Sequence, residues 1–134
     1  MSQADIQNLK ACFDAYNSGD FERLLELWED DVEVVGLLVG GELRGKEAAR
    51  SWLVPEAIDQ RGEPIEFRDL GGRVLVTCDW HIHGRGSGAD VDTRLYMLFT
   101  MRAGKVARLE SFGDEQEALE AVGLSEQDAH ANSS

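Results

Sequence analysis

The spacing of tight turns in the last third of the chain constrains the fold more than any other sequence feature. Apolar-rich runs flank the glycine-rich segment 84–88, and a turn at Ala103-Gly104 leads into a further run that ends at Phe112. Three extended runs joined by two short turns predict an antiparallel meander. Asp114 follows, and its carboxylate can cap a helix over residues 114–122. This order predicts a sheet that a helix can cover.

The first half of the chain predicts three helices. Apolar residues recur at helical spacing over 4–17, over 21–28 and over 45–53. Asp20 precedes the second helix and can cap its free backbone amides. Between the second and third helices, β-branched residues over 32–39 predict a short strand or hairpin.

The order of these elements predicts the fold class. A strand around Ile65 and Phe67 and a long strand over 74–83 precede the rest of the meander. Helices followed by an antiparallel sheet are typical of the α+β class. We expect three N-terminal helices packed on a curved, mostly antiparallel sheet, with a short C-terminal helix. The 134 residues fit one domain, expected over 1–124, with a polar tail over 125–134.

Composition excludes several classes of function. The chain carries 13 Lys and Arg against 26 Asp and Glu, a net charge of -13, and no Lys or Arg follows Arg108. Such a charge does not fit nucleic acid or an anionic membrane surface as a partner. No apolar run approaches the roughly 20 residues that span a bilayer, and residues 1–10 lack the features of a signal peptide. With Cys12 and Cys78 expected as buried reduced thiols, a cytoplasmic location is predicted.

Short motifs in a fixed order connect most of the chain, about residues 5 to 124, to a known family. They are Gly19-Asp20-Phe21, Leu27-Trp28, Asp30-Asp31-Val32, Leu43-Arg44-Gly45-Lys46-Glu47-Ala48, Phe99-Thr100, Gly104-Lys105-Val106, Phe112-Gly113-Asp114 and Glu117-Ala118-Leu119. In this order they resemble the nuclear transport factor 2-like superfamily, particularly its SnoaL-like, polyketide cyclase-like branch. The resemblance implies a cone-shaped α+β barrel, usually a homodimer, with a pocket inside the cone. Members include isomerases, epoxide hydrolases and cyclases, so the fold alone does not select an activity.

Departures from this family pattern exclude its two most familiar activities. Ketosteroid isomerase-like members carry their catalytic base at the position of Gly36, their oxyanion-stabilising acid at that of Tyr96 and a helix-one tyrosine near Cys12. Limonene epoxide hydrolase-like members carry an aspartate at the position of Ser111, two residues beyond an inward aromatic that corresponds to Leu109. Neither glycine nor serine can replace a carboxylate base. We therefore expect neither steroid-type isomerisation nor epoxide hydrolysis.

The long strand over 74–83 has two faces, and only one can meet a pocket. One face carries the ionisable residues Asp79, His81 and His83, and the other carries the apolar residues Cys78, Trp80 and Ile82. A shift of one residue in the register exchanges the two faces. The sequence leaves both alternatives open.

A candidate catalytic site follows if the His81 face meets the pocket. Asp79 or His81 would then act as general base, and Tyr96 would donate a hydrogen bond to a substrate oxygen. The turn at Ala103-Gly104 predicts that Tyr96 and Leu98 share a face with Leu109 and Ser111. The candidate substrate-binding residues are Tyr16, Trp28, Trp52, Arg94, Leu98, Leu109 and Ser111. For the aromatic residues among them, packing in the core is the alternative.

Neither a metal nor a cofactor is expected. Alternate residues of a strand lie roughly 6.6 Å apart, so Asp79 and His83 are separated by about 13 Å and cannot share one ion. The sequence therefore predicts a small-molecule pocket protein and a homodimer, with two hypotheses for its role. One is a cofactor-independent acid–base enzyme of the isomerase, cyclase or hydratase type that acts on a mostly apolar organic substrate. The other is a non-catalytic ligand-binding or dimerisation module.

Overall fold

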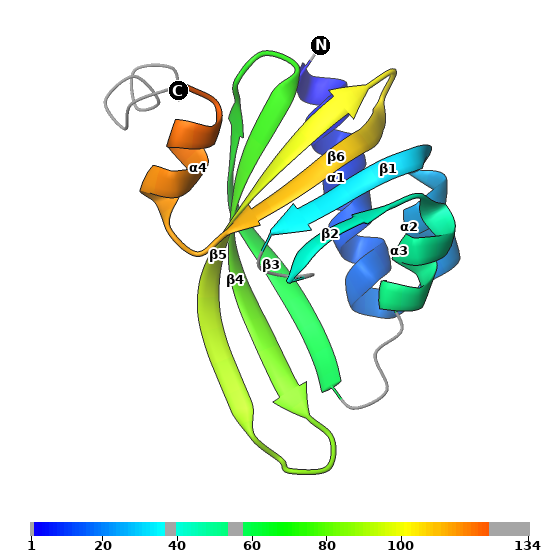
Figure 1. Cartoon of the computed structure of the whole chain (residues 1–134), viewed down its shortest axis with the longest axis vertical. Coiled ribbons are helices and arrows are strands. Elements are labelled where there is room, and N and C mark those ends of the chain that lie inside the picture. Colours follow the sequence, from blue (N-terminus) through cyan, green and yellow to red (C-terminus); the bar gives the residue numbers. More distant parts are fainter. Residues whose placement is uncertain (1, 37–39, 54–57, 124–134) are drawn as a thin grey trace.

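The computed structural model describes residues 2–36, 40–53 and 58–123, and its elements confirm the α+β class (Figure 1). The helices and strands, in chain order, are α1 (Ser2–Ser18), α2 (Phe21–Glu26), β1 (Trp28–Gly36), β2 (Gly41–Arg44), α3 (Lys46–Leu53), β3 (Ile58–Asp69), β4 (Arg73–Gly84), β5 (Asp90–Arg102), β6 (Lys105–Phe112) and α4 (Glu115–Ala121). The predictions made for residues 37–39 and for the tail lie outside the described residues. None of the described helices is long and apolar enough to cross a membrane.

The six strands form one curved sheet in the order β2-β1-β6-β5-β4-β3 (Figure 1). Strands β1 and β6 pair in parallel, and the other neighbours pair antiparallel. The sheet has β2 and β3 at its edges, so the expected cone-shaped barrel is an open, curved sheet. Strands β1 and β2 lie between α2 and α3 in the chain, where a short strand or hairpin was expected.

Both predicted helix caps are present. The Asp20 carboxylate accepts a hydrogen bond from the backbone N–H of Arg23 at 3.2 Å. The Asp114 carboxylate accepts one from the backbone N–H of Gln116 at 2.7 Å and another from Glu117 at 3.4 Å. Each carboxylate thus satisfies amides that a helix leaves unpaired in its first turn.

The helices cover opposite faces of the sheet (Figure 1). Helices α1, α2 and α3 pack on what we call the inner face, where the main apolar core lies. Helix α4 covers part of the outer face, over a second cluster made of Leu75, Leu98, Ala118 and Leu119. Arg68 also lies under α4, where only 3% of its surface is exposed and its guanidinium binds the Glu115 carboxylate at 2.6 Å. This ion pair holds the start of α4 to strand β3.

A β-bulge in β6 corrects the predicted orientation of two residues. Thr100 pairs with Arg108 and Met101 with Val106, so Ala107 is an extra residue without a partner in β5. The regular turn assumed from the sequence has no such residue, and a shift of one residue exchanges the two faces of a strand. Tyr96 and Leu98 therefore lie on the outer face, next to α4, and not with Leu109 and Ser111.

The pairing of β4 settles which of its faces meets the helices. Cys78 and Trp80 are buried in the inner core, and Ile82 packs against it. Asp79, His81 and His83 lie on the outer face, where the side chain of His81 is 41% exposed. The Trp80 face, one of the two alternatives left open, is the inner face. Asp79 and His81, which were candidates for general base if their face met the pocket, do not face the helices.

Candidate functional site

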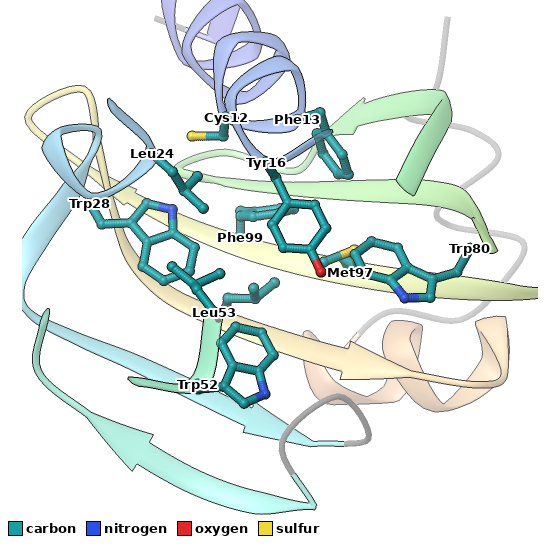
Figure 2. Close-up of a pocket in the computed structure, with 11 residues that line it drawn as sticks. Cys12, Phe13, Tyr16, Leu24, Trp28, Trp52, Leu53, Trp80, Met97 and Phe99 are labelled. Atoms are coloured by element: carbon teal, nitrogen blue, oxygen red, sulfur yellow. The ribbon is translucent and has the colours of Figure 1, made fainter. Parts of the chain in front are cut away.

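The inner face and the helices enclose a cavity of about 40 Å³ (Figure 2). Its lining comes from all three inner helices and from β1, β4, β5 and β6. The lining residues are Cys12, Phe13, Tyr16, Leu24, Trp28, Trp52, Leu53, Trp80, Met97, Phe99 and Leu109. All of them are buried except Tyr16 and Trp52, which are partly exposed and therefore mark the mouth of the cavity.

The cavity is apolar and carries no formal charge. Every lining side chain is aromatic, aliphatic or sulfur-containing, and only Cys12 and Tyr16 can ionise. Burial raises the pKa of the Cys12 thiol to about 12, while the Trp28 indole and Arg23 oppose that shift. Burial also raises the pKa of the Tyr16 hydroxyl to about 12. Both groups are consequently neutral at physiological pH, and Tyr16 remains a hydrogen-bond donor at the mouth.

Aromatic packing fixes the wall that α1 contributes. Residues at helical spacing on α1 point to the sheet, and the Phe13 ring meets the Phe99 ring edge-on with centroids 6.0 Å apart. The Phe13 ring also contacts Phe67 of β3, at 6.5 Å and in the same edge-on arrangement. One turn later, the Tyr16 ring lies 5.6 Å from the Trp80 ring. These contacts hold the helix against three strands of the sheet.

Strand β3 packs against the Trp80 ring and fixes its position. Gly62 pairs with Trp80, and a Cβ atom built on Gly62 would lie 2.3 Å from the indole ring. Only a residue without a side chain leaves room for the ring here. The Asn17 side chain donates to the Gly62 carbonyl at 2.7 Å and accepts from its N–H at 2.9 Å, which ties the end of α1 to the same point. The Trp80 indole N–H donates to Gln60 Oε1 at 2.7 Å, so the ring is also fixed in rotation.

The second buried indole, that of Trp28, has no such partner. Only 3% of the Trp28 surface is exposed, and its Nε1 atom has no hydrogen-bond partner among the described residues. In Figure 2 the nitrogen lies on the edge of the ring that faces Leu24 and Cys12. The indole N–H interacts with the Cys12 sulfur, which acts to lower the thiol pKa, but sulfur is a weak acceptor and the contact does not meet hydrogen-bond geometry. Trp28 therefore presents an unsatisfied donor at the inner end of the cavity.

Four of the seven predicted substrate-binding residues line the cavity, namely Tyr16, Trp28, Trp52 and Leu109. The structure does not bring the other three to it. Leu98 is buried under α4 on the outer face. Arg94 is also on the outer face, where its guanidinium binds Asp79 at 3.1 Å. Ser111 shares the inner face with Leu109 but lies beyond the cavity, where its hydroxyl donates to the Val35 carbonyl at 3.4 Å.

The three predicted catalytic residues also lie away from the cavity. Tyr96 packs against the outer cluster under α4. Asp79 and His81 belong to a row of ion pairs across β3, β4 and β5. In this row, imidazole Nδ1 of His81 lies 2.5 Å from the Asp92 carboxylate, and Nε2 lies 3.6 Å from that of Glu63. His81 and Asp92 line a surface hollow of about 160 Å³ on the outer face, which is separate from the cavity under the helices.

The same row offers no metal centre. His83 pairs with Asp90 at 2.6 Å, next to the His81–Asp92 pair. Within residues 2–36, 40–53 and 58–123, no three His, Cys, Asp or Glu side chains are arranged to hold a metal ion. The cavity lining holds no carboxylate or imidazole, and its sulfur atoms are those of Cys12 and Met97.

Seven lining residues were not among the predicted site residues: Cys12, Phe13, Leu24, Leu53, Trp80, Met97 and Phe99. Those on helices belong to apolar faces that the sequence shows at helical spacing, and this pattern indicated a buried core without indicating a cavity. Trp80 belonged to one of the two alternative faces of its strand. Met97 and Phe99 carried no usable signal, because the Ala107 bulge reverses the faces that a regular hairpin would give.

Comparisons with known proteins agree with this architecture. The family model of the SnoaL-like domain matches residues 9–109. TerC, co-crystallized with polyporic acid, is 25% identical with a TM-score of 0.74, over 87% of this chain and 96% of TerC. A candidate polyketide cyclase from Sinorhizobium meliloti is 30% identical with a TM-score of 0.66, over 79% of this chain and 94% of that one. An NTF2-like protein of unknown function from Burkholderia pseudomallei shares the fold, with 19% identity and a TM-score of 0.75 over 90% and 98% of the two chains. No curated protein sequence matches the chain.

Proposed function

Because the chain belongs to the SnoaL-like domain family, we propose that it binds a small, neutral, mostly apolar organic molecule in the cavity under its inner helices. The observation that carries this proposal is the uncharged lining. A charged ligand would lose its hydration there without gaining an ionic partner, since neither Cys12 nor Tyr16 ionises near neutral pH. An apolar ligand would make van der Waals contacts with the atoms that line the cavity.

A relative supports the binding of an organic ligand by this fold. TerC, which is 25% identical, was crystallized with polyporic acid. The cavity of about 40 Å³ is smaller than typical ligand sites, which measure roughly 300 to 1,000 Å³. Ligand binding therefore requires the lining to move, and the partly exposed Tyr16 and Trp52 at the mouth are the side chains with room to do so.

A set of probes of similar shape and different charge tests this proposal. We expect 1-methylnaphthalene and 1-naphthol to raise the unfolding temperature and to shift NMR signals of cavity residues. The anion 1-naphthoate should bind at least about tenfold more weakly, because its carboxylate must be desolvated without a cation. Equal binding of the anion and the neutral probes would contradict the proposal.

A pair of matched variants locates the binding. Leu109→Phe fills part of the cavity, whereas Leu98→Phe adds the same volume on the outer face under α4. Both substitutions overpack a core, so both should destabilise the protein by a similar amount. Only Leu109→Phe should reduce probe binding. Equal losses in the two variants would place the probe elsewhere.

An acid–base enzyme of the isomerase, cyclase or hydratase type is the second candidate. The 30% identical candidate polyketide cyclase of Sinorhizobium meliloti supports it. In such an enzyme the Tyr16 hydroxyl would donate a hydrogen bond to a ligand oxygen, while no lining carboxylate or imidazole would serve as base. Turnover that falls in Tyr16→Phe while ligand affinity is retained would favour the enzyme over the binding module.

A homodimer remains our proposal for the oligomeric state, and the family resemblance supports it. Analytical ultracentrifugation of the full chain tests it directly. A sedimenting mass near 14.8 kDa at all concentrations would contradict the dimer.

A further inference from the structure

The unpaired indole N–H of Trp28 distinguishes it from the other buried indole of the cavity. Donors that are buried as completely as Trp28 are nearly always hydrogen-bonded in folded proteins, and leaving one unpaired is unfavourable. Trp80 follows that rule, since its N–H donates to Gln60 at 2.7 Å. Trp28 does not, although its surface is only 3% exposed, because the group that its N–H faces is the Cys12 sulfur, a weak acceptor. An unpaired donor within a ligand cavity indicates that its acceptor comes with the ligand.

The surroundings of Trp28 define the acceptor. The inner end of the cavity is formed by Trp28 together with Cys12 and Leu24 (Figure 2). The cavity volume of about 40 Å³ exceeds the minimum of roughly 10 to 15 Å³ that a water-sized group needs, so the cavity has room for one oxygen atom. No cation lines the cavity, which disfavours a carboxylate or phosphate. A neutral carbonyl oxygen matches one N–H donor without requiring a second charged partner.

We propose that Trp28 is a specificity-determining residue whose Nε1–H selects a neutral carbonyl-bearing ligand over a hydrocarbon of the same shape. This inference rests on the proposed function. The carbonyl oxygen accepts the hydrogen bond at the inner end, near Cys12 and Leu24. The apolar body of the ligand extends toward Tyr16 and Trp52 at the mouth.

The test uses 1-indanone and indane, a ketone and a hydrocarbon with the same ring skeleton. Their dissociation constants are measured for the wild-type chain, for Trp28→Phe and for Trp80→Phe. The ratio of the two constants is then compared between chains, because the difference in hydrophobicity between the probes is the same in each chain and cancels. Trp28→Phe should lower the preference for the ketone roughly threefold to tenfold, the range for one neutral hydrogen bond. Trp80→Phe removes a similar ring whose N–H is already occupied, so it should change both affinities and leave their ratio within about twofold.

A second measurement does not depend on the folding of Trp28→Phe. Benzothienylalanine at position 28 keeps the shape of tryptophan and replaces the N–H with sulfur. In the wild-type chain, the indole ¹H–¹⁵N signal of Trp28 is assigned from its contacts with Cys12 and Leu24. That signal should move downfield with 1-indanone and much less with indane.

The outcomes separate this inference from the proposed function. If both probes bind in the cavity and neither replacement at position 28 changes the ketone preference, Trp28 does not select the ligand and the inference is wrong. The same holds if the indole signal responds equally to both probes. If neither probe binds to the wild-type chain, the proposed function fails for this ligand class and the inference fails with it.

Discussion

Gly36 of β1 lies so close to Ser111 of β6 that a Cβ atom on Gly36 would be 2.4 Å from the Ser111 carbonyl oxygen. The φ angle of Gly36 is +107°, a region that residues with a side chain rarely adopt. These two positions are those at which the family comparison placed catalytic carboxylates in other members. The geometry gives a steric reason for the first absence, because no side chain fits at position 36 while the parallel pair of β1 and β6 is kept.

We expect Gly36→Ala to lower the free energy of unfolding by about 2 kcal/mol or more, from steric overlap and backbone strain together. Gly36→Asp should cost at least as much and should not introduce isomerase activity. Chemical denaturation measures the effect. Gly86→Ala is the matched control, since a Cβ atom there meets nothing within 4 Å, and it should stay within about 0.5 kcal/mol of wild type. A fully stable Gly36→Asp would show that the strand pair tolerates a side chain.

Removing one partner of the Arg68–Glu115 pair should loosen α4. Arg68 is almost completely buried, while the Glu115 side chain is 28% exposed. Glu115→Gln should therefore destabilise the fold by roughly 2 kcal/mol, below the 3 to 5 kcal/mol of a fully buried pair. Hydrogen exchange of the α4 amides should increase more than that of α1. The double variant Arg68→Met, Glu115→Leu leaves no buried charge and should be more stable than Glu115→Gln. Unchanged exchange in α4 would argue against this anchoring role.

The two thiols should be almost inert in the folded chain. Burial raises the pKa of Cys12 and of Cys78 to about 12 from a usual value of 9. Near pH 8 we expect a disulfide reagent to modify the native chain at least about a hundredfold more slowly than the chain unfolded in guanidinium, because modification requires opening. Rapid modification of either cysteine in the native chain would contradict its burial.

The raised pKa values of the two thiols predict that the free energy of unfolding falls at alkaline pH. Both thiols keep their protons in the folded state, whereas in the unfolded chain they lose them as pH rises above 9. Their stabilising contribution is present below that pH and is lost as pH rises toward 12. Replacing both with alanine or serine should flatten this part of the stability profile.

His81 should titrate above its usual pKa of 6.5. The hydrogen bond to the Asp92 carboxylate is the main cause, against which desolvation acts, and the Glu63 carboxylate adds to the rise. The contribution of this pair to stability is complete below about pH 6.5 and is lost as pH rises through the folded-state pKa. In NMR titrations, Asp92→Asn should lower the pKa of His81 more than Glu63→Gln does. An unchanged titration in Asp92→Asn would show that this pair does not form in solution.

Substitutions on the outer face should not affect the cavity. Asp79→Asn, His81→Ala and Tyr96→Phe are each expected to leave probe affinity within about twofold of wild type, because these side chains lie on the opposite side of the sheet. Phe99→Leu, inside the cavity, should change it clearly. A tenfold loss in any of the three outer variants would restore the hypothesis that the His81 face carries the function.

Local sequence signals predicted the elements of this fold well. The caps at Asp20 and Asp114 depend on one side chain and its next turn, so they are visible without any knowledge of distant residues. Trp28 was expected at the end of the second helix face but is the first residue of β1. It still lines the cavity.

The orientation of the strands could not be predicted in the same way. The face of Tyr96 depends on how many residues separate it from its partner Phe112 across the hairpin, and the unpaired Ala107 changes that number by one. Nothing in the type of residue 107 indicates a bulge. Similarly, Ile65 is an extra residue in β3, between the pairs Pro64–Cys78 and Glu66–Thr77. A bulge is decided by contacts across the sheet, which the local sequence does not contain.

The Ala107 bulge also limits how functions can be transferred between relatives of this chain. A related protein that lacks this extra residue would present the opposite set of β5 side chains to its cavity, even with an identical sequence from 90 to 102. Aligning the two without a gap at position 107 would assign to Tyr96 a role that belongs to the place of Met97 or Leu95. For this fold, the presence of the bulge has to be established first, and only then does residue identity along the strand indicate a shared chemistry.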